Sequence, residues 1–283
     1  MFFIRHNSDN FTLIDCCICD DAAGRQQLAE IKAESDAKGN RRFISTHPDE
    51  DHLLGLETLD AQIGVSNFYV VKNAATKDDP SDSFKHYCKL RDDPKKASPI
   101  SRGVTRKWLN EPDDKRGSSG IHFLWPDIND ADFKLELAHA QDGLSPNNLS
   151  PIIRYFVDDC WSAMWMGDLE DWFLGLIVDK IKLPQTDILF APHHGRGSAE
   201  VPTEMLKQIS PRIIVIGEAP SEHLHYYDGY NTITQNSAGD IRFDIWDKDL
   251  HVFCSNPNYR ARFLLNKNMT LRGMHYLGSW TLP

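Results

Sequence analysis

The stretch FISTHPDEDHLLGLE, residues 43–57, places His47, Asp49, Asp51 and His52 within six residues, between two apolar runs. In an extended chain, side chains two positions apart point the same way, so His47, Asp49 and Asp51 can converge. His52 is expected at the start of the following helix. Histidine together with carboxylate suits Zn, Mn or Fe, and a pair of ions draws on ligands of this kind from more than one side. We therefore predict that these four side chains bind metal.

A second interpretation of the same residues is an acidic helix N-terminus. Carboxylates are favoured there, because they cap the first backbone N–H groups and interact well with the helix dipole. A single aspartate would fit this interpretation. Carboxylates as dense as Asp49, Glu50 and Asp51 repel one another unless a cation gathers them.

The segments around this stretch alternate between strands and helices. Two short strands, MFFIRH and NFTLIDCCIC, precede a helix over residues 22–38. A strand RRFIST, a helix LLGLETLDAQIG and a strand NFYVVKN follow. This order predicts a layered α/β protein, in which ligands gather at the carboxyl ends of the strands. The His/Asp cluster follows such a strand end.

Residues 74–120 break the alternation with many Pro, Asp, Ser and Gly residues, so we predict a polar insertion or lid with one or two short helices. Its basic residues include Lys85, Lys89, Arg91, Lys95, Lys96, Arg102, Arg106, Lys107, Lys115 and Arg116. This segment is either a solvated loop or a lid that meets an anionic substrate.

Strands return from residue 121 in IHFLWP, FKLELAHA, SPIIRYFVD, CWSAMWMGD, TDILFAPHHG and RIIVIGE, with helices expected over 169–182 and 204–209. Residues 240–283 add C-terminal strands. Two blocks of strands, each with helices, suit a four-layer αββα sandwich of mixed sheets. We predict one domain over residues 1–283.

Two later strand ends also carry ligand-type residues. Asp168 follows Gly167 at the end of a buried strand, where one carboxylate can bridge two metal ions. His193 and His194 follow the strand ILFAP, and one of them can bind metal while the other faces the substrate. Alone, Gly-Asp is a very common turn, and a lone histidine pair belongs more often to the surface or to core packing. Their occurrence together with the first cluster favours a metal site.

A final loop carries His223 and His225, which flank Leu224 and can share a face. They belong either to the rim of the site or to an ordinary loop.

Composition restricts the class of protein. The 283 residues are 41% hydrophobic and 25% charged, with a formal net charge of −10. This balance excludes a protein that coats nucleic acid through bulk positive charge, but it does not exclude a metal enzyme that acts on phosphodiesters. The sequence shows neither a membrane segment nor a signal peptide, and its six cysteines form no CxxC pair. We therefore expect a cytoplasmic protein with reduced cysteines.

The order His-x-Asp-x-Asp-His, Gly-Asp, Pro-His-His-Gly resembles the metallo-β-lactamase fold superfamily. Asp49 stands where most members carry a second histidine, as in the branch of ComEC-type hydrolase domains and choline-phosphate esterases. Asn148, Ser150 and Asp15 match further positions of that branch. The resemblance covers residues 1 to about 230, apart from the 74–120 segment.

This resemblance implies two divalent ions, Zn or Mn, held by six side chains: His47, Asp49, Asp51, His52, Asp168 and His194. Asp168 would bridge the ions, and His193 would stabilise a phosphoryl oxygen or the leaving group. Arg196 replaces the usual small residue after His-His-Gly and would add a phosphate contact. With Asp51, His193 and Arg196 form the predicted catalytic set.

We predict a dinuclear metal-dependent hydrolase that uses a metal-bridging hydroxide. The expected reaction is that of a phosphodiesterase or nuclease acting on DNA, RNA or a nucleotide, with a partner protein if the chain is part of an effector. One alternative is a hydrolase of acyl, thioester or lactam bonds on the same fold. Another is a metal-stabilised, non-catalytic module that binds a partner.

Overall fold

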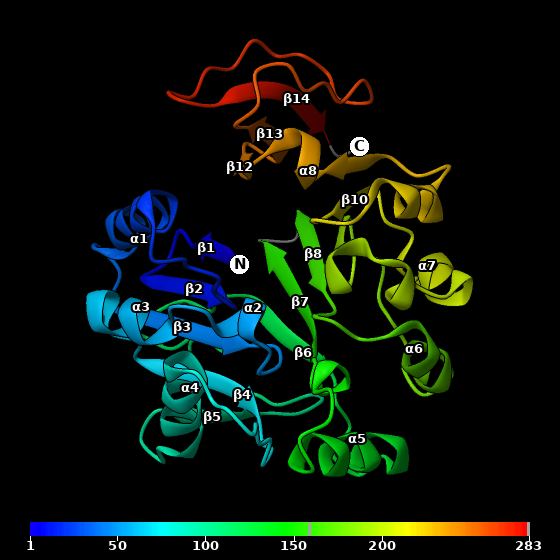
Figure 1. The fold of residues 1–283 in the computed structure, drawn as a ribbon. Coiled ribbons are helices and arrows are strands. Elements are labelled where there is room, and N and C mark those ends of the chain that lie inside the picture. Colours follow the sequence, from blue (N-terminus) through cyan, green and yellow to red (C-terminus); the bar gives the residue numbers. More distant parts are fainter. Residues whose placement is uncertain (158–159, 282–283) are drawn as a thin grey trace. The chain divides into compact units, whose positions relative to one another are not determined.

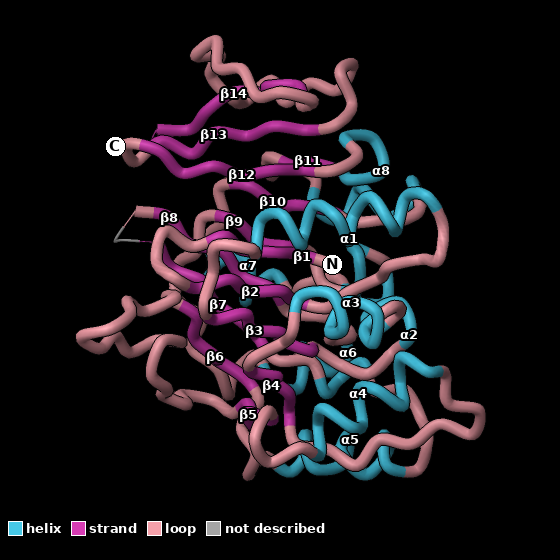
Figure 2. The backbone as a smooth tube through the Cα atoms, turned by 90° about the vertical axis from the view of Figure 1, so that its left-hand side faces the viewer, coloured by secondary structure: helices cyan, strands magenta, loops and turns pink. Residues whose placement is uncertain are grey.

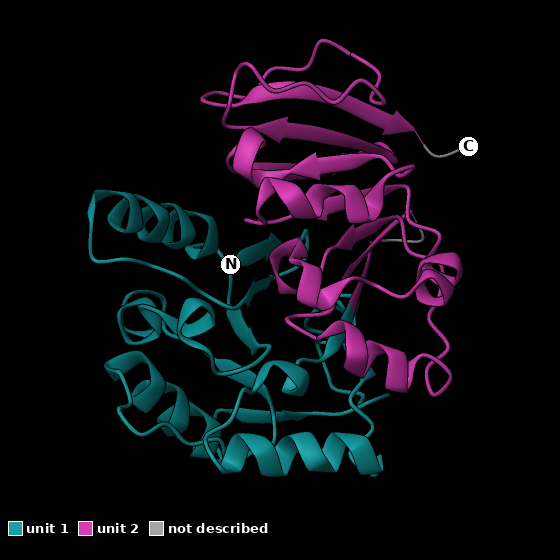
Figure 3. Ribbon diagram, turned by 45° about the vertical axis from the view of Figure 1, so that its right-hand side comes forward, with its two compact units in different colours: residues 1–153 teal, residues 154–283 magenta. Residues whose placement is uncertain are grey.

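The structure is a computed structural model that describes residues 1–157 and 160–281. It contains two mixed sheets and a small antiparallel sheet, with helices between the strands (Figure 1). This confirms the predicted α/β class. Backbone contacts divide the chain into unit 1, Met1–Ile153, and unit 2, Arg154–Pro283 (Figure 3). The single domain and the four-layer packing stay predictions.

The first sheet belongs to unit 1 and has the order β1-β2-β3-β4-β5 (Figure 2). Its strands are β1 (Phe2–Arg5), β2 (Asn10–Ile14), β3 (Asn40–Ser45), β4 (Asn67–Val71) and β5 (Ala97–Ile100). The β1–β2 pair is antiparallel, and the remaining pairs are parallel. β3 therefore lies at the centre of the sheet, and its carboxyl end carries the stretch that begins at Thr46.

Helices cover one face of this sheet (Figure 1). They are α1 (Ala22–Ser35), α2 (Glu50–Leu53), α3 (Leu56–Ile63) and α4 (Asp82–Asp92). The apolar side chains of alternate strand positions, such as Phe11, Phe43 and Phe68, are fully buried and pack with Leu53 and Leu59. The core thus fixes the helix that carries His52 against the centre of the sheet.

The segment 74–120 is only in part the insertion that we predicted. Its first part supplies α4, the expected short helix, and β5, which pairs with β4 as a regular strand of the sheet. Residues 101–120, all of them described, contain no helix or named strand. Arg42 of β3 holds this part through hydrogen bonds to the Trp108 carbonyl at 2.8 Å and the Ser119 hydroxyl at 2.6 Å. Its role as a lid stays a prediction.

One predicted strand is wrong, because residues 133–140, FKLELAHA, lie in helix α5 (Ala131–Gln141). The alternation of apolar and polar residues suggested a strand. The helix begins instead because the Asp130 side chain accepts a hydrogen bond from the Phe133 N–H at 3.1 Å and caps it. Leu135, one of the alternating apolar residues, is 58% exposed and contributes little to a core.

The second sheet has the order β11-β10-β9-β8-β7-β6. Its strands are β6 (Ile121–Trp125), β7 (Ile152–Val157), β8 (Trp161–Trp165), β9 (Ile188–Phe190), β10 (Ile213–Ile216) and β11 (Thr232–Thr234). The strands from β8 to β11 are parallel, so their carboxyl ends lie at one edge. Unit 2 also contains α6 (Asp171–Ile177), α7 (Thr203–Ile209) and α8 (Gln235–Ala238).

The predicted C-terminal strands form the third sheet, β12 (Ile241–Trp246), β13 (Asp249–Cys254) and β14 (His275–Thr281), all antiparallel. The short 3-10 helices are η1 (Asn147–Leu149), η2 (His193–Gly195), η3 (Gly197–Ala199) and η4 (Ser221–Tyr227). Within the described ranges, no helix has the length and apolar character needed to cross a bilayer.

Candidate metal centre

The first ligand set lies in unit 1, on the turn between β3 and α2. His47 and His52 are buried, with 2% and 7% exposure. Asp49 is the N-cap residue of α2, yet its carboxylate makes no capping hydrogen bond with the described residues. Its Oδ2 atom lies 3.9 Å from His47 Nε2, and its Oδ1 atom lies 3.4 Å from the Lys77 ammonium. The acidic-cap interpretation therefore does not account for Asp49.

The ring of His47 is oriented through its Nδ1 atom. This atom lies 3.0 Å from the Thr46 hydroxyl and 3.3 Å from the Ser150 hydroxyl. The His47 and His52 rings are neighbours, with centroids 4.1 Å apart. Ser150 thus contacts a predicted metal ligand. The geometry directs Nε2 of His47 toward Asp49.

Asp15 orients His52. The Asp15 carboxylate accepts hydrogen bonds from the Thr46 N–H at 2.8 Å and the Thr46 hydroxyl at 2.6 Å. Its Oδ2 atom also lies 2.9 Å from His52 Nδ1. A metal-binding histidine almost always donates its other ring N–H to a carboxylate, a carbonyl or water. The Asp15–His52 pair has this arrangement, with Nε2 as the atom that would coordinate an ion.

A second buried carboxylate supports the segment that carries Ser150. Glu136 of α5 accepts a hydrogen bond from the Asn148 amide at 2.9 Å, and His139 lies 3.0 Å from its other oxygen. Asn148 lies in η1, two residues before Ser150, whose hydroxyl contacts His47. The Glu136–Asn148 pair therefore fixes the backbone behind the first ligand set. This role of Glu136 could not be predicted from the sequence, since its helix was expected to be a strand.

The second ligand set lies in unit 2. Asp168 follows β8 and is only 4% exposed. Its Oδ2 atom lies 3.7 Å from His193 Nε2 and 3.9 Å from His194 Nε2. The Gly167 carbonyl accepts a hydrogen bond from the His193 N–H at 2.9 Å, which links the ends of β8 and β9. Unit 2 thus brings together three residues that the sequence placed at two separate strand ends.

The backbone after β9 has an unusual conformation. His193, His194 and Gly195 have φ values of 48°, 59° and 86°, all in the left-handed region. This run turns the two adjacent histidines so that both Nε2 atoms approach Asp168. Burial lowers the pKa of His193 below its ordinary value; the Asp168 charge opposes this effect, and the Arg196 charge adds to it.

The remaining predicted residues lie around this loop. His223 Nδ1 accepts a hydrogen bond from the Gly197 N–H at 3.1 Å, so His223 holds the loop that follows the histidine pair. His225 is exposed, and its Nδ1 atom lies 2.6 Å from the Glu222 carbonyl of its own turn. Arg196 is exposed at the start of η3. Of the two rim histidines, the structure connects His223 to the loop of the candidate site.

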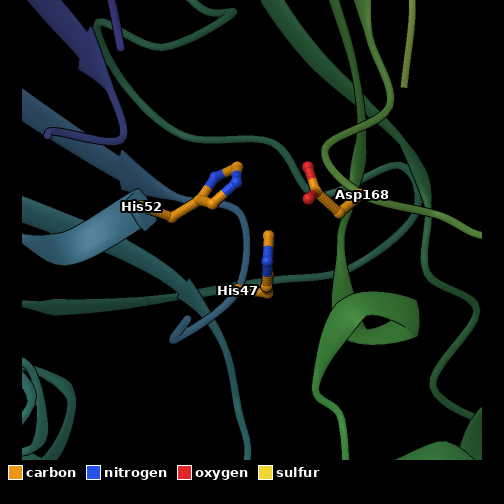
Figure 4. Close-up of side chains that lie close together, drawn as sticks. All are labelled: His47, His52 and Asp168. Atoms are coloured by element: carbon orange, nitrogen blue, oxygen red, sulfur yellow. The ribbon is translucent and has the colours of Figure 1, made fainter. Parts of the chain in front are cut away.

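Three buried side chains have the chemistry to hold a metal ion, His47 and His52 of unit 1 and Asp168 of unit 2 (Figure 4). Asp51 and His194 offer further ligand atoms. Imidazole and carboxylate are the donors that Zn and Mn accept in proteins. The donor set therefore fits the predicted metal.

Comparison with known proteins adds no family. No family model matches the chain, and no curated protein matches its sequence. Two mixed sheets and buried His/Asp ligands are consistent with a metallo-β-lactamase fold but do not identify one.

Lys77 is a residue of the site that our sequence analysis missed. It lies in the run KDDP, and a single lysine among carboxylates gave no signal. In the structure its ammonium is the charged group next to Asp49.

Proposed function

We propose that the chain is a metal-dependent phosphodiesterase or nuclease, and that the side chains of the two ligand sets hold its divalent ions. The observation that carries this proposal is the Asp15–His52 hydrogen bond, since it has the form of a carboxylate that orients a metal-binding histidine. Asp168, with both His193 and His194 beside it, supplies the complementary donors.

Bound divalent ions would polarise the scissile group and lower the pKa of a coordinated water toward about 7. The residues of the chain would orient the metal ligands and contact the substrate. Asp15 would keep the Nδ1 proton on His52, and Thr46 and Ser150 would hold the ring of His47. His193, whose Nδ1 atom lies 3.1 Å from the Ser198 hydroxyl, would present Nε2 to a phosphoryl oxygen or to the leaving group.

Three features support a phosphodiester as the substrate. Asp49 occupies the position that distinguishes the ComEC-like branch. Arg196 is exposed directly after His193-His194-Gly195, and Lys77 lies beside Asp49. Guanidinium and ammonium groups are the usual protein partners of phosphate oxygens. A nucleic acid as the natural substrate, a cytoplasmic location and an effector role with a protein partner stay predictions.

The test measures metal content and cleavage together. The purified chain is loaded with Zn or Mn and incubated with bis-p-nitrophenyl phosphate and with single- and double-stranded DNA and RNA. We expect cleavage by the wild type, and at least about a hundredfold loss in Asp51→Ala and His193→Ala. His86→Ala, which alters a histidine of α4 that pairs with Asp60 away from the predicted ligands, is the control and should retain activity.

Cleavage of lactam or thioester substrates alone would favour the acyl hydrolase instead. Metal binding without turnover of any of these substrates would favour the non-catalytic module.

A further inference from the structure

Unit 1 contains a cavity of about 240 Å³ next to Asp49. Two segments far apart in the sequence form it: residues 75–78 after β4 and residues 143–146 after α5. Lys77 is the only cationic side chain among its lining residues, all of which the structure describes. The cavity therefore joins a predicted metal ligand to a lysine.

Lys77 is held in place on two sides. Its Nζ atom lies 3.4 Å from Asp49 Oδ1 and 5.2 Å from the centroid of the Phe84 ring. The lysine side chain is 27% exposed, so solvent still reaches it. Phe84 is itself anchored, since its N–H donates to the Ser81 hydroxyl that caps α4. An ammonium group has three donors, so Lys77 can contact Asp49 and a further anion at the same time.

Both lining segments of the cavity are bonded to the end of α5. The Thr76 N–H donates to the Ala140 carbonyl at 3.2 Å, and the Thr76 hydroxyl donates to the Gln141 carbonyl at 2.9 Å. The Leu144 N–H donates to the His139 carbonyl at 3.0 Å. These bonds occupy carbonyl groups at the negative end of the helix dipole, which would otherwise repel an anion.

Several other cations of this region already have carboxylate partners. Five of the ten basic residues that we assigned to the lid lie in ion pairs: Lys85 with Asp82, Arg91 with Asp92, Lys96 with Asp60, Lys107 with Asp113, and Arg116 with Asp9. Lys77 differs because its carboxylate partner, Asp49, is itself a predicted metal ligand. The exposed Asp78 also lines the cavity and opposes an anion, so binding there would depend on Lys77.

We propose that this cavity binds a phosphate group of the substrate other than the scissile one, with Lys77 as its ligand. The inference rests on the proposed function and specifies its substrate class. Lys77 favours substrates with several phosphates in sequence, such as an oligonucleotide, over an isolated phosphodiester. A charged hydrogen bond of this kind corresponds to about a tenfold or greater change in affinity.

The test separates binding from turnover. In the His193→Ala background with Mn, affinity for a short single-stranded oligothymidylate is measured by fluorescence anisotropy. Adding Lys77→Gln should weaken binding about tenfold, whereas Lys77→Arg should retain most of it. Lys85→Gln removes an exposed lysine of the neighbouring helix and should change affinity less than twofold, about the precision of the measurement. Thermal unfolding of each variant checks that the chain stays folded.

Equal affinities of Lys77→Gln and Lys85→Gln would overturn the inference, as would the absence of binding by the His193→Ala chain itself. Thymidine 5′-monophosphate is the second probe. A loss confined to the mononucleotide would overturn the assignment to a multi-phosphate substrate. In the His193-containing chain, Lys77→Gln should raise KM for the oligonucleotide more than it raises KM for bis-p-nitrophenyl phosphate, which has no second phosphate group. Failure of the wild type to cleave either compound would contradict the proposed function, whereas anisotropy tests the subsite separately.

Discussion

The two ligand sets are positioned by different means. In unit 1, side chains orient the rings of His47 and His52, with Asp15 as the central acceptor. In unit 2, the backbone orients the rings, because His193 and His194 lie in a run of left-handed residues that continues into Gly195. The first set lies at the end of the central strand β3 and in the short helix α2, while the second combines Asp168 after β8 with the two histidines of the 3-10 helix η2.

This difference determines which substitutions each set tolerates. A ring held by side-chain hydrogen bonds is sensitive to the loss of one acceptor, even when shape is conserved. A turn held by its backbone is sensitive to an added Cβ atom and is less sensitive to its side-chain neighbours. The two sets should therefore respond in opposite ways to substitutions of the two kinds.

Gly195→Ala should have the largest effect on stability. A Cβ atom there would lie 2.6 Å from Ile216 Cγ2, at a φ of +86°. Strain and overlap together should lower the free energy of unfolding by about 2–4 kcal/mol, measured by denaturant titration.

Gly64→Ala is the matched control, with a φ of +66° and no atom within 4 Å of the added Cβ. It keeps the backbone strain and removes the overlap, so it should cost about 1 kcal/mol. Equal losses of unfolding free energy in the two variants would mean that the turn after β9 adjusts to the added atom and does not hold the two histidines rigidly.

Asp15→Asn tests the set in unit 1. The substitution keeps the shape of the side chain but removes the charge that His52 and Thr46 bind. Affinity for Zn or Mn should fall about 10–100-fold, measured by competition with a chelator. Asp60→Asn is the control, because Asp60 forms a similar pair with His86 at 3.0 Å, away from the predicted ligands. If both variants retained wild-type affinity, Asp15 would have a structural role only.

Much of the first set could be predicted from the sequence because its residues are adjacent in the chain. The apolar strand directly before His47, Asp49 and His52 indicates where the strand ends, and the residue types themselves indicate the metal donors. The left-handed turn at His193 and His194 had no such signal, since neither residue commonly adopts that conformation. Its only local sign was the glycine that follows.

The rest depended on contacts between distant residues. The role proposed for Lys77 depends on its contacts with Asp49 and Phe84 and on the cavity beside the end of α5. No local sequence pattern connects these residues. Helix α5 itself was missed because its residues alternate like a strand, whereas the Asp130 cap starts a helix. Here capping and tertiary packing outweighed periodicity.

Reliance on buried polar side chains should also make unit 1 sensitive to pH. Burial, with the charges of Arg42 and Lys38, lowers the pKa of His6 from 6.5 to about 3. Between these values the unfolded chain binds a proton at His6 and the folded chain does not. The stability that depends on a neutral His6 is therefore fully present above pH 6.5. As the pH falls below this value, the free energy of unfolding decreases by about 1.4 kcal/mol per pH unit. His6→Gln should reduce the slope of unfolding free energy against pH by this amount between pH 4 and about 6. If His6→Gln left the slope of unfolding free energy against pH unchanged, His6 would not be the source of this pH dependence.

His223→Ala should have the smallest effect and gives the sharpest contrast with Asp15. The substitution removes the acceptor of the Gly197 N–H, a single neutral hydrogen bond at 3.1 Å. We expect a loss of about 1 kcal/mol in unfolding free energy and a change in metal affinity of less than about threefold. His225→Ala is the control and should change neither quantity, since His225 bonds within its own exposed turn. A tenfold loss of metal affinity in His223→Ala alone would show that unit 2, like unit 1, depends on a side chain to orient its ligands.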